Sequence, residues 1–561
     1  MFLSRNDISH FAVNPEVNIN RSRMDLNNNI KFTGNTGRII PFYCLEVLPG
    51  DTFEVETSLV CRLQTLIHPL MDNLFLDTYY FYVPNRLVWD NWQHFMGEPD
   101  HAWKSTSTYM VPALKIGYGV SGVSTEYETP ALYLSAFKDS IADYLGCGIT
   151  GDDVVQYLNV LPFRAYNKIY DDWFRDENLI DPINLYTGDD NVEWDADDPL
   201  LGGKPYYAAK LHDYFTSALP QAQRGNPVTL AANFAKGWPV QTHTTTHSPT
   251  YGIGFAPLQV EGSSGSYKYS LKSGQISGND NYWYQRVAPY DGTFAPINLY
   301  AIPEANTSLG ISINDLRMAF QVQKFMETSA RYGARYIEMI YGMFGVKSPD
   351  ARLQRSEYLG GHRVPITIHQ IVNQTETVDA PLGNVGAMSF TTDSHQDFVH
   401  SFTEHGFILG LAVVRYKHSY SQGINKMFLR RTLYDYYFPV FANIGEQPVY
   451  NMEIYAGTGS VNNSVFGYQE AWASYRYMPD RVAGEMRPGI TNTLASWHLG
   501  DYYESLPTLS ESWIAEDPAI VDRAIAVTSE VADQFLFDVY VKNRATRPMP
   551  VYSIPGLVDH H

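Results

Sequence analysis

The sequence predicts a mainly β protein: a β-sandwich whose strands are far apart along the chain and are separated by long loop and helix insertions. Strand-like segments occur before residue 85 and again after residue 360, and the interval between them has a different composition. Hydrophobic residues make up 44% and aromatic residues 14% of the chain, which allows a large core. Charged residues make up only 18%, against about 25% in ordinary globular proteins. This depletion is typical of surfaces that become buried against a partner.

The early strands flank a turn at Pro49–Gly50, a pair that favours turns. After this turn, apolar and polar residues alternate, as in a strand with one buried face. The side chains expected to point inward are Phe53, Val55, Thr57, Leu59, Cys61 and Leu63. Residues 73–83 are apolar on both faces and are expected to lie inside the sandwich. Residues 86–97 then predict a short helix that ends at Gly97.

The late strands are predicted at residues 363–372, 406–416 and 533–542. The last of them alternates through Phe535, Phe537, Val539 and Val541.

Two helices are predicted between the early and late strands. Residues 161–174 carry aromatic side chains at helical spacing, with Pro162 in the first turn. Another helix begins at a capping-box pattern near residue 312 and runs towards Gly345. Residues 228–305 are rich in Gly, Ser, Thr, Pro and Tyr, and their aromatic content predicts an ordered insertion. Residues 1–37 predict an N-terminal arm that runs over a surface and is not part of the core.

Acidic residues outnumber basic ones, and the formal net charge is −20. This argues against a protein that wraps nucleic acid over its whole surface, although a local basic patch is permitted. Residues 171–198 hold eleven Asp or Glu and one Arg, so they supply half of the excess. A solvated loop is the favoured interpretation. The alternative is a structural divalent-cation site or an interface site at residues 189–198. The candidate cation ligands are Asp189, Asp190, Asp195 and Asp197.

No motif indicates catalysis. The chain has no phosphate loop, zinc helix or nucleophile elbow, and it therefore predicts no catalytic residue and no cofactor. His243 and His247 have the spacing of metal ligands on a helix, but the surrounding Thr and Pro residues favour a loop. Three cysteines without CxxC spacing are expected to be reduced and inert. Without an apolar leader or a long apolar run, a soluble protein kept in a cytoplasm is expected.

Residues 466–481, FGYQEAWASYRYMPDR, combine aromatic and Arg side chains that could form a core, a base-stacking surface or a subunit interface. Tyr468, Trp472 and Tyr475 have the spacing of one buried helical stripe, and the segment has little net positive charge. Packing in a core or an interface is therefore favoured over base stacking. The interface candidates are Tyr468, Trp472, Tyr475, Arg476, Tyr477 and Arg481.

Several long motifs resemble the major capsid proteins of the Microviridae, specifically the gokushovirus branch. They are FGYQEAWASYRYMPDRVAGEMRP, TLASWHLGDYY, RPMPVYSIPGLVDH, SRNDISHFAVNPEVNINRSRMDL, PFYCLEVLPGDTFEV and DTYYFYVPNRLVWDNW. The resemblance implies a viral jelly roll of eight strands with long loop and helix insertions. It implies one capsid domain over residues 38–561, with inserted excursions at 98–360. The variable insertion at 228–305 is then a protrusion at the three-fold axis that takes part in host attachment.

The same resemblance implies the partners. Copies of the chain assemble into a T=1 icosahedral shell around a circular single-stranded DNA genome, in the virion and, during assembly, in the host bacterial cytoplasm. Further implied partners are a small basic DNA-binding protein, pilot and scaffolding proteins, and a host receptor. The candidates for DNA contact in the basic arm and tail are Arg5, Arg21, Arg23, Lys31, Arg38, Lys542, Arg544 and Arg547.

Two other classes stay open at this point. A jelly-roll carbohydrate-binding protein or glycosidase has the same architecture. A free-standing protein that binds single-stranded DNA is disfavoured by the charge balance.

Overall fold

The computed structural model describes nine continuous stretches and, in addition, the backbone of short strands between residues 240 and 301. The stretches are residues 20–98, 109–117, 130–148, 156–225, 313–332, 335–347, 354–372, 385–457 and 459–552. The chain forms two compact units, and the smaller one is Gly225–Met326. The smaller unit contains the predicted insertion at 228–305. No helix among the described residues is long and apolar enough to cross a membrane.

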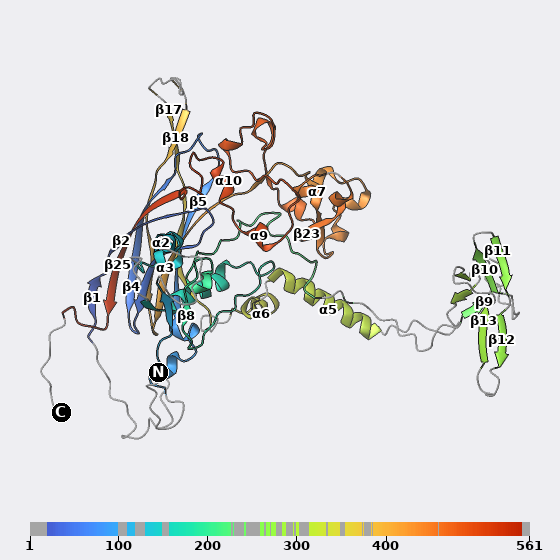
Figure 1. Cartoon of the computed structure of the whole chain (residues 1–561), viewed down its shortest axis with the longest axis horizontal. Coiled ribbons are helices and arrows are strands. Elements are labelled where there is room, and N and C mark those ends of the chain that lie inside the picture. The colour runs from blue at the N-terminus through green and yellow to red at the C-terminus, as the bar shows by residue number, and fades with distance from the viewer. Residues whose placement is uncertain are drawn as a thin grey trace, which may run out of the picture. The chain divides into compact units, whose positions relative to one another are not determined.

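The larger unit is built on two antiparallel sheets, which Figure 1 shows in the part that carries both chain ends. In the first sheet the order is β1-β25-β4-β19, and β2 also pairs with β25. In the second sheet the order is β16-β5-β20-β3. The strands of the first sheet are β1 (Ser22–Asp25), β2 (Asn28–Gly34), β4 (Thr52–Leu63), β19 (Thr391–Ser401) and β25 (Phe535–Arg547). Those of the second are β3 (Ile40–Val47), β5 (Leu74–Pro84), β16 (Glu357–Pro365) and β20 (Gly406–Tyr416).

The main core lies between the two sheets. The alternation predicted for β4 is confirmed, because all six predicted inward side chains are buried. They pack with Phe537 from β25 and with Tyr80 and Ile408 from the second sheet. The predicted turn is also confirmed, since Gly50 has a φ of 92°, a conformation that favours glycine. The larger unit is therefore a β-sandwich.

The second sheet is buried on its other face as well, as predicted for residues 73–83. Phe81 on β5 and Leu409 on β20 share a second core with the segment that follows β5. The predicted helix at 161–174 lies here, as α4 (Leu161–Ile169) with Pro162 in its first turn and a π-helical turn at Tyr170–Phe174. The other elements of this layer are α1 (Trp92–Phe95), β6 (Ala113–Ile116), α2 (Pro130–Phe137), α3 (Ile141–Tyr144), β7 (Gln156–Asn159) and β8 (Val192–Glu193).

A second long excursion, between β20 and β25, was not predicted from the sequence. It has a small core of its own, in which Val449, Ile454 and Phe466 pack with Tyr214 and Phe215. Its elements are β21 (Ser419–Tyr420), β22 (Gln447–Tyr450), α7 (Asn451–Ile454), β23 (Val465–Gln469), α8 (Ala473–Arg476), β24 (Asp480–Arg481), α9 (Glu511–Ile514) and α10 (Ala519–Asp522).

The smaller unit contains short strands in pairs or triplets. They are β9 (Val240–Thr242), β10 (Leu258–Gly262), β11 (Gly265–Tyr269), β12 (Leu271–Gln275), β13 (Trp283–Val287), β14 (Ala295–Pro296) and β15 (Leu299–Ala301). β10 pairs with β11 and β14, β12 pairs with β13, and β9 pairs with β15.

The single helix predicted up to Gly345 is wrong. It is two helices, α5 (Ile313–Tyr332) and α6 (Tyr336–Phe344). Arg335 between them has extended backbone, and its side chain binds the Glu177 carboxylate and the Asp171 carbonyl. These two contacts hold Arg335 in place and explain why the helix is interrupted between α5 and α6.

The strand predicted at 363–372 is also divided. β16 ends at Pro365, and the Ile366 N–H still donates to the carbonyl of Leu74, the first residue of β5, at 2.8 Å. Beyond this point β17 (Ile368–Val372) pairs instead with β18 (Val385–Ser389).

Part of the predicted arm belongs to the first sheet. Residues 22–25 and 28–34 pair with β25 in antiparallel register, so the expectation that residues up to 37 lie outside the core fold is wrong for this part. Thr36 is fully buried and donates to the Gln534 side chain through its N–H at 2.9 Å and its hydroxyl at 2.7 Å. These partners are almost five hundred residues away in the chain, and no local pattern reveals them.

Candidate assembly surface and nucleic-acid contacts

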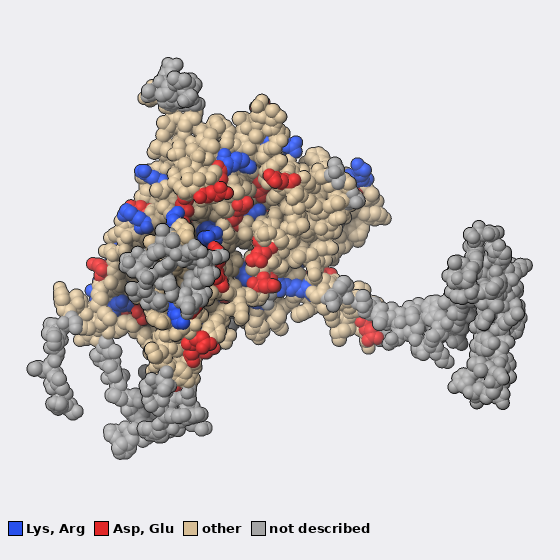
Figure 2. Space-filling view, in the orientation of Figure 1, with Lys and Arg blue, Asp and Glu red and all other residues tan. Residues whose placement is uncertain are grey.

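Large apolar side chains gather on the surface of the excursion between β20 and β25. We call this region the aromatic surface and define it by its exposed side chains: Ile424, Met427, Phe428, Leu433, Tyr434, Tyr436, Tyr437, Phe438, Val440, Tyr475, Tyr477 and Met478. Figure 2 shows few charged side chains on the part of this unit that carries β23 and α7. A monomeric protein rarely exposes so many large apolar side chains together, so this region has the character of an interaction site.

The aromatic surface is held in shape by short turns. Residues 426–441 form three single turns of 3-10 helix. The Asp435 carboxylate accepts hydrogen bonds from the backbone N–H groups of Arg431 (2.8 Å) and Thr432 (2.6 Å), and these bonds lower the pKa of Asp435. The turns satisfy their peptide groups locally. The Tyr434 ring on this segment is exposed. A groove of about 560 Å³ adjoins them, lined by Phe428 and Tyr477 among others.

Trp472 is buried and contacts residues of the aromatic surface. Its φ is 64°, which is unusual for a bulky residue, and its N–H donates to the Gln447 side chain at 3.0 Å. The buried indole donates to the Phe441 carbonyl at 2.8 Å and meets the Tyr437 ring edge-on at 5.6 Å between centroids. The guanidinium of Arg430 lies 3.9 Å from the centre of the Tyr475 ring. Residues 430–441 and 472–475 therefore form one continuous structure.

The predicted helical stripe through Tyr468, Trp472 and Tyr475 is wrong. Tyr468 lies on β23, Trp472 precedes α8, and α8 has only four residues. The interface candidates therefore separate by position. Tyr475 and Tyr477 are exposed on the aromatic surface, Arg476 is paired with Glu470 at 2.6 Å, and Arg481 is exposed on β24. Their role at a subunit interface stays a prediction.

The candidates for DNA contact lie mostly on the solvent face of the first sheet. Four of them are paired with carboxylates: Lys31 with Asp538 (3.5 Å), Lys542 with Glu56 (2.9 Å), Arg544 with Glu54 (3.2 Å) and Arg547 with Asp51 (2.9 Å). The pairs of Lys31, Lys542 and Arg544 join neighbouring strands and make this face nearly neutral. The Arg547 pair differs, because Asp51 is fully buried and Arg547 lies over the ring of the core residue Phe53. Figure 2 shows both signs of charge interspersed on this unit.

The other candidates differ from these four. Arg38 stacks on the Tyr207 ring at 3.7 Å and donates to the Pro205 carbonyl at 2.5 Å. Arg21 and Arg23 are exposed, and within the described residues neither has a carboxylate within 4.0 Å. Arg5 lies outside the described residues. Among the described candidates, Arg21 and Arg23 therefore carry exposed positive charge without a carboxylate partner, on β1 and directly before it.

The acidic segment at 189–198 is tied into local structure. Asp189 accepts from Trp89 at 2.6 Å and from Asn91 at 2.7 Å, and Asp197 pairs with Lys204 at 3.0 Å. The Asp190 carboxylate accepts a hydrogen bond from the Tyr186 hydroxyl, and the Asp195 carboxylate accepts one from the Asp197 N–H. The cation site predicted here stays a prediction.

The cysteines have the environment expected of inert thiols. All three are free. Burial raises the pKa of Cys44 to about 12, and burial also raises the pKa of Cys61 and of Cys147. A thiol with a raised pKa is a poor nucleophile at neutral pH. The two histidines at 243 and 247 lie outside the described residues.

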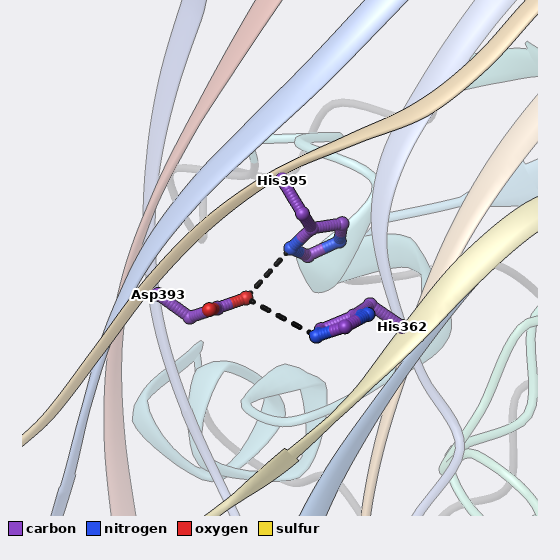
Figure 3. Close-up of side chains that lie close together, drawn as sticks. All are labelled: His362, Asp393 and His395. Carbon is purple, nitrogen blue, oxygen red and sulfur yellow. Dashed lines mark hydrogen bonds and ion pairs between the residues drawn. The ribbon is translucent and has the colours of Figure 1, made fainter.

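His362, Asp393 and His395 form a cluster that was not predicted from the sequence (Figure 3). Asp393 and His395 are two residues apart on β19, so a strand places both side chains on the same face. This spacing was the one sequence feature that could have indicated the cluster, because His362 comes from another strand. The aromatic surface was also missed, since residues 426–444 show neither helical nor strand periodicity.

The sandwich, the neutral polar face and the exposed aromatic surface define a structural protein built for association. A family model described as capsid protein (F protein) matches residues 12–557. The chain is 36% identical over 605 residues to capsid protein VP1 of Chlamydia phage 1, with 98% of each chain covered. It is 38% identical over 576 residues to VP1 of Spiroplasma virus 4, covering 98% of this chain and 97% of that one. It is 35% identical over 567 residues to VP1 of Bdellovibrio phage phiMH2K, covering 99% and 98%.

The chain therefore belongs to the capsid protein (F protein) family, and its resemblance to the gokushovirus capsid proteins is confirmed. It is a structural, non-enzymatic protein of the virion that assembles with copies of itself into a shell. The alternative of a carbohydrate-binding protein or glycosidase is excluded by this membership.

Proposed function

We propose that the chain is the major coat protein of a T=1 icosahedral shell that encloses a circular single-stranded DNA genome. The observation that carries this proposal is the aromatic surface, because a member of a capsid family that exposes this much apolar area has a partner to bury it. That partner is a second copy of the chain. In a closed shell each copy presents several different patches that complement those of its neighbours.

We further infer that the sandwich is an eight-stranded jelly roll. Its support is a nested set of strand pairs, in which the first strand pairs with the last and so on inward: β2 with β25, β3 with β20, β4 with β19 and β5 with β16. β1 is then an extension of the β2 edge. Jelly rolls recur in viral coats because two packed sheets make a rigid block whose loops supply the contacts.

The remaining partners follow from the family. The insertion at 228–305 forms a protrusion at the three-fold axis and takes part in attachment to a host receptor; its separation as a compact unit supports this role. Pilot and scaffolding proteins act during assembly in the host bacterial cytoplasm. A small basic protein neutralises most of the DNA phosphates, and Arg21 and Arg23 add weak, salt-sensitive contacts.

Assembly tests the proposal directly. Val440 is 87% exposed on the aromatic surface, and Val531 is 78% exposed outside it. Val440→Asp places a charge where a neighbouring copy would desolvate it, so we expect a folded chain that forms no closed particles. Val531→Asp is the matched control and should form particles like those of the unmodified chain.

Both variants are expressed together with the viral assembly proteins and examined by electron microscopy and sedimentation. Circular dichroism establishes that each variant is folded. Uniform particles from Val440→Asp, in the same yield as from the control, would contradict the role of the aromatic surface. An unmodified chain that stays monomeric under these conditions would contradict the proposed function itself.

A further inference from the structure

The His362 cluster lies where the two sheets meet at one edge of the sandwich. β16 and β19 are edge strands of different sheets. They approach closely, since a Cβ atom added at Gly360 on β16 would lie 2.3 Å from the Asp397 carbonyl oxygen on β19. His362 comes from β16, while Asp393 and His395 come from β19 and point toward it (Figure 3). Side chains two residues apart share one face of a strand, so the alternation places both β19 residues at the same edge.

The side-chain distances fit a bound metal ion. The Oδ2 atom of Asp393 lies 2.7 Å from Nδ1 of His395 and 3.8 Å from Nε2 of His362. One ligand atom from each of the three side chains can be chosen so that all lie within 4.8 Å of one another. Zinc holds nitrogen and oxygen ligands at about 2.0–2.2 Å, which places tetrahedral ligands about 3.3 Å apart. Small side-chain rotations therefore suffice to bring the three atoms around one ion.

The second nitrogen of His395 already has the partner that metal-binding histidines use. Nε2 lies 2.9 Å from Oδ1 of Asp397, whose side chain is fully buried. Oδ2 of Asp397 accepts in turn from the Thr57 hydroxyl at 2.5 Å, and Thr57 lies 2.8 Å from the Tyr80 hydroxyl. Such carboxylate partners fix the tautomer and the orientation of a ligating imidazole.

This arrangement requires a positive charge at Nδ1 of His395. When Nε2–H donates to Asp397, a neutral ring directs its Nδ1 lone pair at the Asp393 carboxylate, 2.7 Å away. Two electron-rich atoms at this distance need a cation between them, either a proton or a metal ion. The two carboxylates thus create a site with a strong preference for positive charge.

We propose that His362, Asp393 and His395 bind a divalent transition-metal ion, with zinc as the best fit, and that the ion joins the edge strands of the two sheets. Two imidazoles and one carboxylate suit zinc and similar metals, whereas magnesium and calcium prefer oxygen ligands throughout. The His362 side chain is 48% exposed, which gives the ion a path from solvent and leaves room for a water molecule as the fourth ligand.

Metal binding by the full-length, tag-free chain tests this inference. Zinc binding is measured by isothermal titration calorimetry after removal of bound metal, with the terminal His560 and His561 replaced by Ala in every sample so that they cannot contribute. We expect one zinc ion per chain at the cluster, and a visible absorption band typical of tetrahedral coordination when cobalt replaces zinc.

Three variants locate the site. His362→Ala removes a half-exposed ligand and should fold, yet it should lose the zinc ion and the rise in Tm that zinc gives. Asp397→Asn keeps all three ligands and should weaken binding by about 10- to 100-fold. His369→Ala on β17 is the matched control, because His369 is exposed outside the cluster and its removal should change nothing.

Two results would overturn the inference. If the parent chain takes up no zinc at micromolar concentration, the cation between Asp393 and His395 is a proton alone. If His362→Ala binds zinc as tightly as His369→Ala does, the ion is held elsewhere.

Discussion

The charge pairing on the first sheet predicts which basic residues hold DNA. The perturbation is a double variant, Arg21→Ala with Arg23→Ala, compared with Lys542→Ala combined with Arg544→Ala. Both variants remove two positive charges that the sequence alone ranks as equivalent. In the structure they differ, because Lys542 is paired with Glu56 and Arg544 with Glu54, while Arg21 and Arg23 have no carboxylate partner among the described residues.

The expected magnitude follows from the number of unpaired charges. Each phosphate neutralised on a single strand contributes about 0.7 to the slope of log K against log salt, so Arg21 and Arg23 together contribute about 1.4. A slope of about 1.4 corresponds to about a sevenfold loss of affinity between 50 and 200 mM salt. A lysine or arginine whose charge is already balanced by a neighbouring carboxylate neutralises no phosphate and so displaces no counterion from the DNA. Its removal should therefore leave the slope unchanged.

The assay is fluorescence-anisotropy titration of the unassembled chain with a labelled single-stranded oligonucleotide at several salt concentrations. The Arg21/Arg23 variant should lose about 1.4 from the slope, and the Lys542/Arg544 variant should keep it. Equal losses in the two variants would refute the reasoning, since they would show that the ion pairs on the first sheet open to bind phosphate. An unchanged slope in the Arg21/Arg23 variant would refute the assignment of these residues to DNA contact.

Two further predictions concern stability. Asp77 is buried on β5 and binds Arg363 on β16 through bonds of 2.6 and 2.8 Å and Arg415 on β20 at 2.5 Å. Asp77→Asn leaves both guanidinium groups without their counter-charge, so we expect chemical denaturation to show a loss of about 3–5 kcal/mol; a loss below about 1 kcal/mol would contradict this. Burial lowers the pKa of His418, but the adjacent carboxylates, above all that of Asp501, raise it to about 9. Its stabilising contribution should therefore be complete below about pH 6.5, the value in unfolded chains, and be lost as the pH rises through about 9. Thermal unfolding from pH 6 to 10 measures this, and the decline should be absent in His418→Gln.

Local patterns sufficed where one stretch of chain decides its own structure. The alternation from Phe53 to Leu63 identified a buried face because neighbouring side chains in a strand point in opposite directions. Pro162 marked the start of α4 because its ring fits the first helical turn. The same reasoning failed at residues 363–372. β5 begins at Leu74, which accepts a hydrogen bond from the Ile366 N–H, and the chain beyond that point turns to a new partner.

Distant contacts decided the rest. Residues 28–34 are a strand because β25 lies beside them, and Arg335 separates α5 from α6 because Glu177 holds it. Trp472 adopts a left-handed backbone conformation because Gln447 and Phe441 accept its hydrogen bonds. None of these partners is near in sequence. The His362 cluster could not be predicted for the same reason, since His362 and Asp393 meet only when the two sheets pack together.

The charges are distributed differently on the first sheet and on the aromatic surface. This difference explains how an acidic chain could enclose DNA as proposed. Its basic side chains on the first sheet are matched by carboxylates on neighbouring strands, so that face neither attracts nor strongly repels phosphate. The aromatic surface carries few charges and can be buried between copies without the cost of desolvating them. Under the proposed function, attraction for the genome would then depend on Arg21, Arg23 and a separate basic protein. In the coat that we propose, apolar contacts that salt leaves intact would hold the subunits, and contacts that salt weakens would hold the DNA. Raising the salt concentration should therefore release DNA contacts before it dissociates the shell.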